Sequence, residues 1–178
     1  NVPFIIKPPA NVKTQAGVRD ALVELIDFPA TVFDITGIDP DYDMFGQSLL
    51  PLITGDTDVH RDAVFCEGGR RIGEEQAMEK DTPSFFDSKE LYAPRVQLQG
   101  REDGSHSKAT MCRTQDFKYV RRLYELDELY DLQNDPTELT NLIDDPSYAG
   151  TLATLRNRML EWYQDTSDVI PRKTDKRN

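Results

Sequence analysis

Residues 130–142 read Tyr-Asp-Leu-Gln-Asn-Asp-Pro-Thr-Glu-Leu-Thr-Asn-Leu, and this stretch sets the layout of the second half of the chain. Residues 130–132 have the pattern of a strand end. Asn134, Asp135 and Pro136 then predict a turn, because Asn and Asp side chains bond their own backbone and proline fixes φ. The apolar side of the residues that follow completes a predicted strand-turn-helix connection.

The segments around this stretch predict a small antiparallel sheet covered by one helix. Residues 109–113 and 117–123 flank a short polar turn, which is a hairpin pattern, and residues 128–132 supply a third strand. Residues 146–164 carry apolar side chains at steps of three and four, which is typical of a helix with one buried face. These apolar residues are Leu152, Leu155, Met159 and Tyr163.

Three short apolar runs in the first part of the chain have the pattern of buried strands. They lie at residues 2–6, 21–25 and 63–66. Continuous apolar runs of this length fit strands that are covered on both faces, as in parallel sheets under helices. With the helix predicted between the second and third runs, the order favours an α/β layer with crossover connections.

Two helices are predicted in the same part. Asp27 is placed to cap the first helix, with Pro29 in the first turn, where a missing N–H costs little. Gly37 suits the left-handed residue that ends a helix. A second, shorter helix is predicted over residues 47–53 and ends by Gly55.

The chain therefore divides into four predicted parts. An α/β part, a segment without regular pattern, a small subdomain and a polar tail follow one another. The fold class is α/β, with an antiparallel sheet and one packed helix near the C-terminal end. The predicted boundaries are 1–67, 68–107, 108–167 and 168–178.

Composition excludes several classes of partner. The 178 residues carry a formal net charge of −11, which argues against a nucleic-acid partner, because phosphate binding needs clustered Lys and Arg. No run approaches the ~18 apolar residues that span a bilayer. Cys66 and Cys112 make no disulfide framework, and both are predicted to be small buried residues rather than ligands or nucleophiles.

Several segments resemble the sulfatase family. The stretch ELYDLQNDPTELTNL at 128–142 is similar to the C-terminal signature of that family. VPFIIKPP at 2–9, RDALVELIDFPATVFDITGI at 19–38 and GQSLLPLITG at 46–55 resemble a block that lies earlier in the same proteins. The resemblance covers most of 2–163. It implies the C-terminal end of an alkaline-phosphatase-like α/β sheet, followed by the small antiparallel subdomain.

The reactive part of a sulfatase has no match in the sequence. The family's nucleophile lies in a Cys/Ser-x-Pro-x-Arg motif that matures to formylglycine, and neither Cys66 nor Cys112 starts such a motif. The family's metal-binding Asp segments are not matched either. The resemblance therefore implies a C-terminal portion with no catalytic or metal-binding residue of its own. The parent sulfatase is expected to use formylglycine and Ca²⁺ or another divalent cation.

His106 and Lys108 are the first candidates for substrate binding. They lie at i and i+2 at the start of a predicted strand, where extended side chains point to one side. An imidazole and an ammonium group together suit an anionic group or a sugar hydroxyl. The alternative is an exposed polar start to the strand.

Glu67, Arg70 and Arg71 form the second candidate group, with two glycines between the acid and the arginines. They follow the strand predicted at 63–66, and the carboxyl ends of strands carry sites in α/β proteins. Glycine permits close backbone approach, and arginine binds sulfate through two hydrogen bonds. The alternative is a flexible turn with solvated arginines.

The resemblance predicts a sulfatase portion that is inactive alone and contributes structure and part of the pocket for a sulfated small molecule or glycan. Its partner would be the N-terminal part of the same protein, and an exposed apolar face could also pair two copies. Two alternatives stay open. One is a phosphodiesterase or phosphonate hydrolase of the same superfamily, and the other is a non-catalytic carbohydrate-recognition or interaction module.

Overall fold

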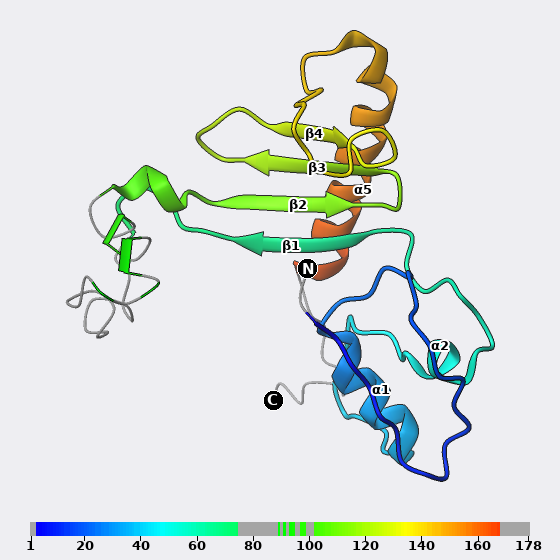
Figure 1. Cartoon of the computed structure of the whole chain (residues 1–178). Helices are drawn as coiled ribbons and strands as arrows, with labels where there is room; N and C mark the ends of the chain where they lie inside the picture. Colours follow the sequence, from blue (N-terminus) through cyan, green and yellow to red (C-terminus); the bar gives the residue numbers. More distant parts are fainter. Residues whose placement is uncertain are drawn as a thin grey trace, which may run out of the picture. The chain divides into compact units, whose positions relative to one another are not determined.

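A computed structural model describes residues 3–74, 89, 91, 93–94, 97–98 and 102–167 (Figure 1). They form two compact units, and each is described by itself. The first holds the residues up to 64 together with those from 157, and the second holds 65–156. The predicted tail and much of the predicted irregular segment lie outside the described residues, so the four predicted boundaries stay predictions.

The second unit is built on a four-stranded sheet in the order β1-β2-β3-β4. The arrows of neighbouring strands alternate in direction (Figure 1). The strands β2 and β3 form the predicted hairpin, with Cys112 opposite Tyr119, and Tyr119 lies opposite Leu129 of β4. The bounds are Val64–Gly68 for β1, Ala109–Arg113 for β2, Phe117–Arg122 for β3 and Glu128–Asp131 for β4.

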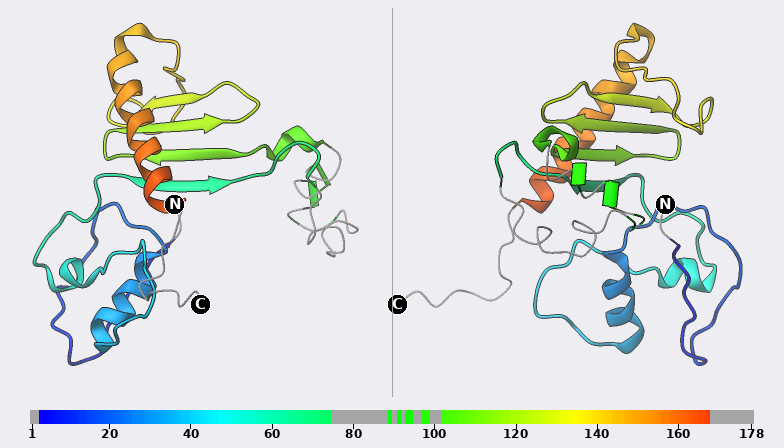
Figure 2. Two further views of the ribbon diagram at one scale, coloured as in Figure 1. Left: turned by 180° about the vertical axis from the view of Figure 1, so that it is seen from behind. Right: turned by 60° about the vertical axis from the view of Figure 1, so that its left-hand side comes forward.

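The residues of α5 (Ala149–Thr166) up to Arg156 lie over one face of this sheet, as the left-hand view of Figure 2 shows from behind. Cys112, Tyr119 and Leu129 lie opposite one another on three strands, so their side chains share this face, and all three are fully buried. Leu155 of α5 is buried as well, and the guanidinium of Arg156 lies 5.6 Å from the centre of the Tyr119 ring. The predicted antiparallel sheet with one packed helix is thereby confirmed.

A buried carboxylate ties the sheet to this helix. Asp127 accepts hydrogen bonds from the Tyr119 hydroxyl (2.7 Å), from Arg121 Nη1 (2.9 Å) and from the backbone N–H of Arg122 (3.0 Å). Arg156 Nη2 lies 3.3 Å from the same carboxylate. Burial by itself would raise the pKa of Asp127, but the hydrogen bonds from Tyr119, Arg122 and Arg121 outweigh it and hold the pKa below its usual value.

The turn predicted at residues 134–136 is confirmed, and the carboxylates of Asp131 and Asp135 bond the backbone around it. Asp131 accepts from the N–H groups of Gln133 (3.0 Å) and Asn134 (3.1 Å). Asp135 accepts from the N–H groups of Leu139 (2.7 Å) and Thr140 (2.8 Å). These bonds satisfy backbone N–H groups that a loop without regular structure would otherwise leave to water.

The first unit contains the two predicted helices, α1 (Asp27–Thr36) and α2 (Leu50–Thr54). Gly37 and Gly55 follow them in the left-handed conformation, with φ of 68° and 80°. The predicted helix ends are therefore confirmed, and the reason is the one expected from sequence: glycine has no Cβ to oppose positive φ.

Two strand predictions in this unit are wrong. The described residues at 3–6 and 21–25 form no strand, and Ile5 is 91% exposed. An apolar run becomes a strand only when another strand accepts and donates its hydrogen bonds, and the described residues provide none here. The run at 63–66 does form β1, but this strand joins the antiparallel sheet of β2 rather than a crossover layer.

Candidate functional site

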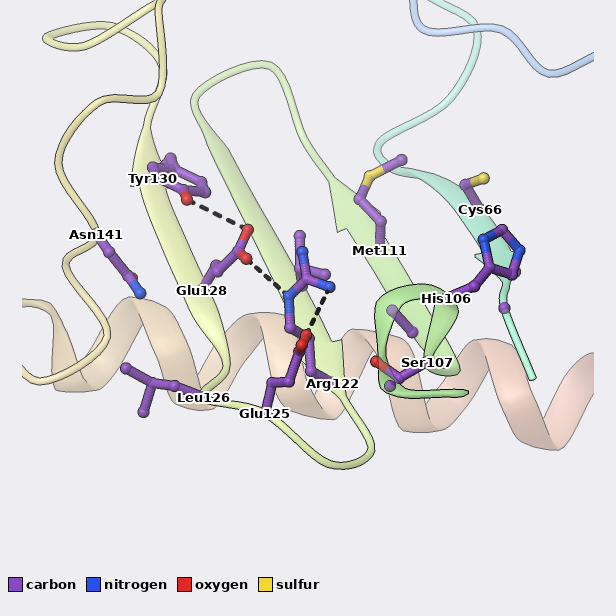
Figure 3. A pocket seen from close by; sticks show the side chains of 15 residues that line it. Cys66, His106, Ser107, Met111, Arg122, Glu125, Leu126, Glu128, Tyr130 and Asn141 are labelled. Atoms are coloured by element: carbon purple, nitrogen blue, oxygen red, sulfur yellow. Dashed lines mark hydrogen bonds and ion pairs between the residues drawn. The ribbon is translucent and has the colours of Figure 1, made fainter. Parts of the chain in front are cut away.

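The face of the sheet turned away from Tyr119 carries an open pocket of about 770 Å³ (Figure 3). All of its lining residues belong to the second unit. Side chains reach it from every strand and from the short 3₁₀ helix η1 (Asp103–His106). Those that matter for its chemistry are Cys66, His106, Arg122, Glu128, Tyr130 and, beside them, Glu125.

Glu128 is the central polar group of this pocket. Its carboxylate accepts from Arg122 Nε at 2.7 Å and from the Tyr130 hydroxyl at 3.2 Å. Arg122 Nη1 in turn lies 3.2 Å from a carboxylate oxygen of Glu125 (Figure 3). Arg122 therefore lies between two acids and presents a fixed, charged fork to the pocket.

The charge states of these groups follow from their contacts. The hydrogen bond to Glu128 raises the pKa of Arg122, although partial burial acts against it. Burial and then the charge of Glu128 raise the pKa of the Tyr130 hydroxyl. The pocket thus offers guanidinium N–H donors from Arg122 and oxygen acceptors from Glu128 and Tyr130, a set that suits polar and hydroxyl-rich ligands.

His106 enters the pocket because two loops meet through their backbones. The N–H of Arg70 donates to the carbonyl of His106 at 3.0 Å, and the N–H of Lys108 donates to the carbonyl of Arg70 at 2.9 Å. Gly69 makes this approach with φ of 78°, and a Cβ there would lie 2.2 Å from the carbonyl oxygen of Ser107. The structure therefore brings the two candidate motifs of the sequence together.

The side chains of those motifs do not all point to the same place. Lys108 Nζ pairs with Glu67 Oε1 at 3.0 Å, and neither residue lines the pocket. The expectation that His106 and Lys108 share one side is wrong, because His106 ends a 3₁₀ helix and the chain is not extended there. Arg70 bridges to Ser107 through its backbone, and Arg71 is exposed. Binding of substrate by these five residues stays a prediction.

No local pattern in the sequence marks Arg122, Glu128 and Tyr130 as a site. They alternate along β3 and β4, a pattern that equally describes a solvated sheet face. Cys66 was expected to be buried, and that is wrong: the residue is exposed at the pocket, because β1 is the edge of the sheet. The burial of Cys112 is confirmed.

A second polar cluster lies in the first unit. Asp27 is fully buried, pairs with the guanidinium of Arg61, and lies 3.2 Å from His60 Nε2. Its carboxylate also accepts from the N–H groups of Gln47 and Glu24, each at 2.8 Å. The prediction that Asp27 caps α1 is wrong, because the side chain turns away from the helix N–H groups toward these partners.

Burial opposes the charge on Asp27 and by itself would raise the pKa of that carboxyl. The hydrogen bond from Arg61, with those from the two backbone N–H groups, outweighs burial and holds the pKa below its usual value. Every oxygen of this carboxylate is committed to a contact within the unit. We therefore regard the cluster as structural.

Two further searches cover the described residues only. Within them, no group of three or more His, Cys, Asp or Glu side chains is arranged to hold a metal ion. None of their helices is both long and apolar enough to cross a bilayer.

The fold matches one part of the structures of sulfatases and related hydrolases. A putative sulfatase from Bacteroides thetaiotaomicron is similar over 84% of this chain and 27% of its own, with TM-score 0.56 and 22% identity. A phosphonate monoester hydrolase of Agrobacterium radiobacter is similar over 83% of this chain and 28% of its own, with TM-score 0.54 and 25% identity.

The sequence narrows this class. Residues 1–68 and 77–165 match the family described as N-sulphoglucosamine sulphohydrolase, C-terminal, and the chain belongs to that family. The human N-sulphoglucosamine sulphohydrolase is 25% identical over 189 residues, which cover 93% of this chain and 37% of that protein. The resemblance seen in the sequence is thereby confirmed.

Other relatives are also named as sulfatases. The ulvan-active sulfatase of Formosa agariphila is 25% identical over 95% of this chain and 34% of its own length. An uncharacterized sulfatase of Escherichia coli, YidJ, is 42% identical over 55 residues, which cover 31% of this chain and 11% of that protein. The matched segments thus cover between 11% and 37% of the length of these relatives and of the human protein.

Proposed function

We propose that this chain is the C-terminal part of a sulfatase and that it completes the substrate pocket of that enzyme. The observation that carries the proposal is the family match over 1–68 and 77–165, together with relatives named as sulfatases. The substrate class would be a sulfated sugar. One structure of the same fold holds D-glucosamine-2-N,6-O-disulfate, which agrees with that class.

In this proposal the reactive groups lie outside these residues. The sequence has no Cys/Ser-x-Pro-x-Arg motif for a formylglycine nucleophile. When bound, a divalent cation such as Ca²⁺ would stabilise the negative charge of the sulfate during ester cleavage. This chain would instead bind and orient the sugar, with Arg122 and His106 as donors and Glu128 as an acceptor for hydroxyl groups.

Activity assays test the proposal at two levels. The purified chain should give no turnover of an aryl sulfate, whereas the complete gene product should hydrolyse a sulfated glucosamine. In the complete protein, His106→Ala should raise KM, while Lys108→Ala, which removes a side chain outside the pocket, should change it little. If KM rises equally in both variants, His106 and Lys108 would bind the substrate together, as the sequence predicts, and the pocket would not define the binding site. Turnover of the aryl sulfate by the purified chain would refute the proposal that the reactive groups lie outside these residues.

A phosphonate or phosphodiester hydrolase is the second candidate. The similarity to the Agrobacterium phosphonate monoester hydrolase, at 25% identity, favours this alternative. The same complete protein should be assayed with a phosphonate monoester beside the sulfate ester. A clear preference for the phosphonate would replace the sulfatase assignment.

A non-catalytic carbohydrate-recognition module is the remaining alternative from the sequence. It requires that the chain alone binds a sugar and unfolds cooperatively. Calorimetric titration of the chain with a sulfated disaccharide distinguishes such a module from a part of a sulfatase. Tight binding by the isolated chain, combined with an inactive complete protein, would support the module.

A further inference from the structure

The charged side chains of the pocket in Figure 3 do not favour an anion. Among the described residues that line it, Arg122 faces the two carboxylates of Glu125 and Glu128. With His106 counted as neutral, negative charge is therefore in excess within the lining. A pocket that binds a sulfate group by charge would have the opposite balance, because cations concentrate anions and carboxylates repel them.

The two carboxylates also use the N–H groups through which Arg122 would bind a sulfate. A guanidinium binds an oxyanion through two parallel N–H bonds, either from Nε and Nη2 or from Nη1 and Nη2. Nε already donates to Glu128 at 2.7 Å, and Nη1 donates to Glu125 at 3.2 Å. A sulfate could use either pair only by displacing a carboxylate, which would then lie beside a second negative charge.

The rest of the lining suits the ring of a sugar. Apolar side chains come from Ala109, Met111, Val120 and Leu126. Met111 lies directly opposite Val120 in the register of β2 and β3, so the two form a continuous apolar floor. Such a floor packs against the C–H groups of a sugar ring, while a few polar groups at its edge bond the hydroxyls. The volume of about 770 Å³ exceeds what a sulfate group alone would fill.

We propose that this pocket binds an uncharged sugar unit next to the sulfated one and discriminates against a second sulfate group, an inference that rests on the proposed function. The substrate class narrows to glycans in which the sulfated unit has a neighbour with free hydroxyl groups. Glu128 accepts a hydrogen bond from one of these hydroxyls. Glu125 and Glu128 determine the specificity in two ways, since they hold the guanidinium of Arg122 and their charge repels a sulfate.

Equilibrium binding to the complete gene product tests this inference. Two disaccharides are compared by calorimetry, one with a sulfonate on the first unit alone and one with a sulfonate on both units. The sulfonates replace sulfate esters, so no ligand is hydrolysed during the titration. The protein should bind the first disaccharide at least about tenfold more tightly, which corresponds to 1.4 kcal/mol. In Glu125→Gln/Glu128→Gln this ratio should fall to about one, because the repulsion is removed and the N–H groups of Arg122 become available.

The ratio is measured within each variant, so a smaller folded fraction affects both ligands alike. Glu161→Gln is the matched control, because it removes the same charge from an exposed position on α5, where Asn157 donates to the carboxylate, and should leave the ratio unchanged. The single variant Glu125→Gln should give an intermediate ratio.

Several results would overturn the inference. Equal or tighter binding of the disaccharide with two sulfonates would make Arg122 a sulfate ligand, and binding of neither disaccharide would show that the pocket takes no sugar. A ratio that Glu125→Gln/Glu128→Gln leaves unchanged would assign the preference to other groups. An equal fall in Glu161→Gln would assign it to the overall negative charge of the protein. Hydrolysis is not measured, so a protein that shows the preference but cleaves no sulfate ester would contradict only the proposed function.

Discussion

The side chain of Asn141 holds the backbone of Leu129 along the outer edge of β4. Its Oδ1 accepts from the N–H of Leu129 at 2.9 Å, and its Nδ2 donates to the carbonyl of Asp127 at 3.1 Å. The N–H of Leu142 then donates to the carbonyl of Leu129 at 2.8 Å. The signature segment therefore works as a substitute for a fifth strand, which protects an edge that would otherwise be open to pairing.

Replacing Asn141 should destabilise the sheet. In Asn141→Ala the N–H of Leu129 and the carbonyl of Asp127 lose their partners, and we expect a loss of about 1–3 kcal/mol in the free energy of unfolding. Urea denaturation measures the loss, and hydrogen exchange should show faster exchange at the Leu129 amide. Asn157→Ala is the control, because that amide donates to the exposed Glu161 one turn along α5 rather than to a strand backbone. Unchanged exchange at Leu129 would show that Asn141 does not hold this edge.

Local signals in the sequence predicted the elements that local chemistry controls. The hairpin of β2 and β3, the helix ends at Gly37 and Gly55 and the turn at 134–136 each depend on residues only a few positions apart. Turn and cap preferences act over that range, so a single sequence contains the information.

The wrong predictions concern contacts between residues that lie far apart in the sequence. The run at 21–25 has the composition of a strand, but a strand exists only beside a partner, and no local pattern reveals one. The carboxylate of Asp27 occupies the sequence position of a helix cap, yet its strongest contact is to Arg61, 34 residues away. The pocket around Glu128 likewise combines residues from β1 to β4 and from η1, whose meeting depends on the backbone contact at Gly69.

That contact gives a second prediction. Gly69→Ala should displace the loop that carries His106, because a Cβ would meet the Ser107 carbonyl at 2.2 Å and positive φ disfavours alanine. We expect a loss of about 1–3 kcal/mol in stability and a shifted NMR signal for the His106 ring. Gly68→Ala is the matched control, because a Cβ there meets no atom within 4 Å. If both variants behave alike, the close approach at Gly69 does not position His106.

Acid should destabilise the second unit through Asp127. The pKa of this carboxyl is held below that of the unfolded chain, about 3.9, so ionised Asp127 favours the folded state. The stabilisation is complete above the unfolded pKa and is lost as the pH falls from about 4 through the folded pKa. Denaturation measured from pH 7 to pH 2 should show this decline, and Asp127→Asn should flatten it. A decline of the same steepness in the variant would assign the acid sensitivity to other carboxylates.

The ion pair of Arg61 and Asp27 should contribute far more to stability than the pair of Arg158 and Asp62, although each joins an arginine to an aspartate. Asp27 is fully buried, so Arg61→Met leaves a charge without its main partner, and we expect a loss of about 3–5 kcal/mol. Asp62 is 70% exposed, and water can replace the bonds of 2.8 and 3.0 Å that Arg158 makes to it. Arg158→Met should therefore cost less than about 1 kcal/mol.

A double variant separates the charge of Asp27 from the packing of Arg61. Removing both charges in Asp27→Asn/Arg61→Met should recover part of the stability lost in Arg61→Met, because no buried charge is left unpaired. The Asn side chain can still accept from the N–H of Gln47, so the contact between α1 and residue 47 is retained. If the double variant is clearly less stable than Arg61→Met, the carboxylate of Asp27 stabilises this unit even without Arg61. Its stabilising contacts would then be those to His60 and to the backbone N–H groups.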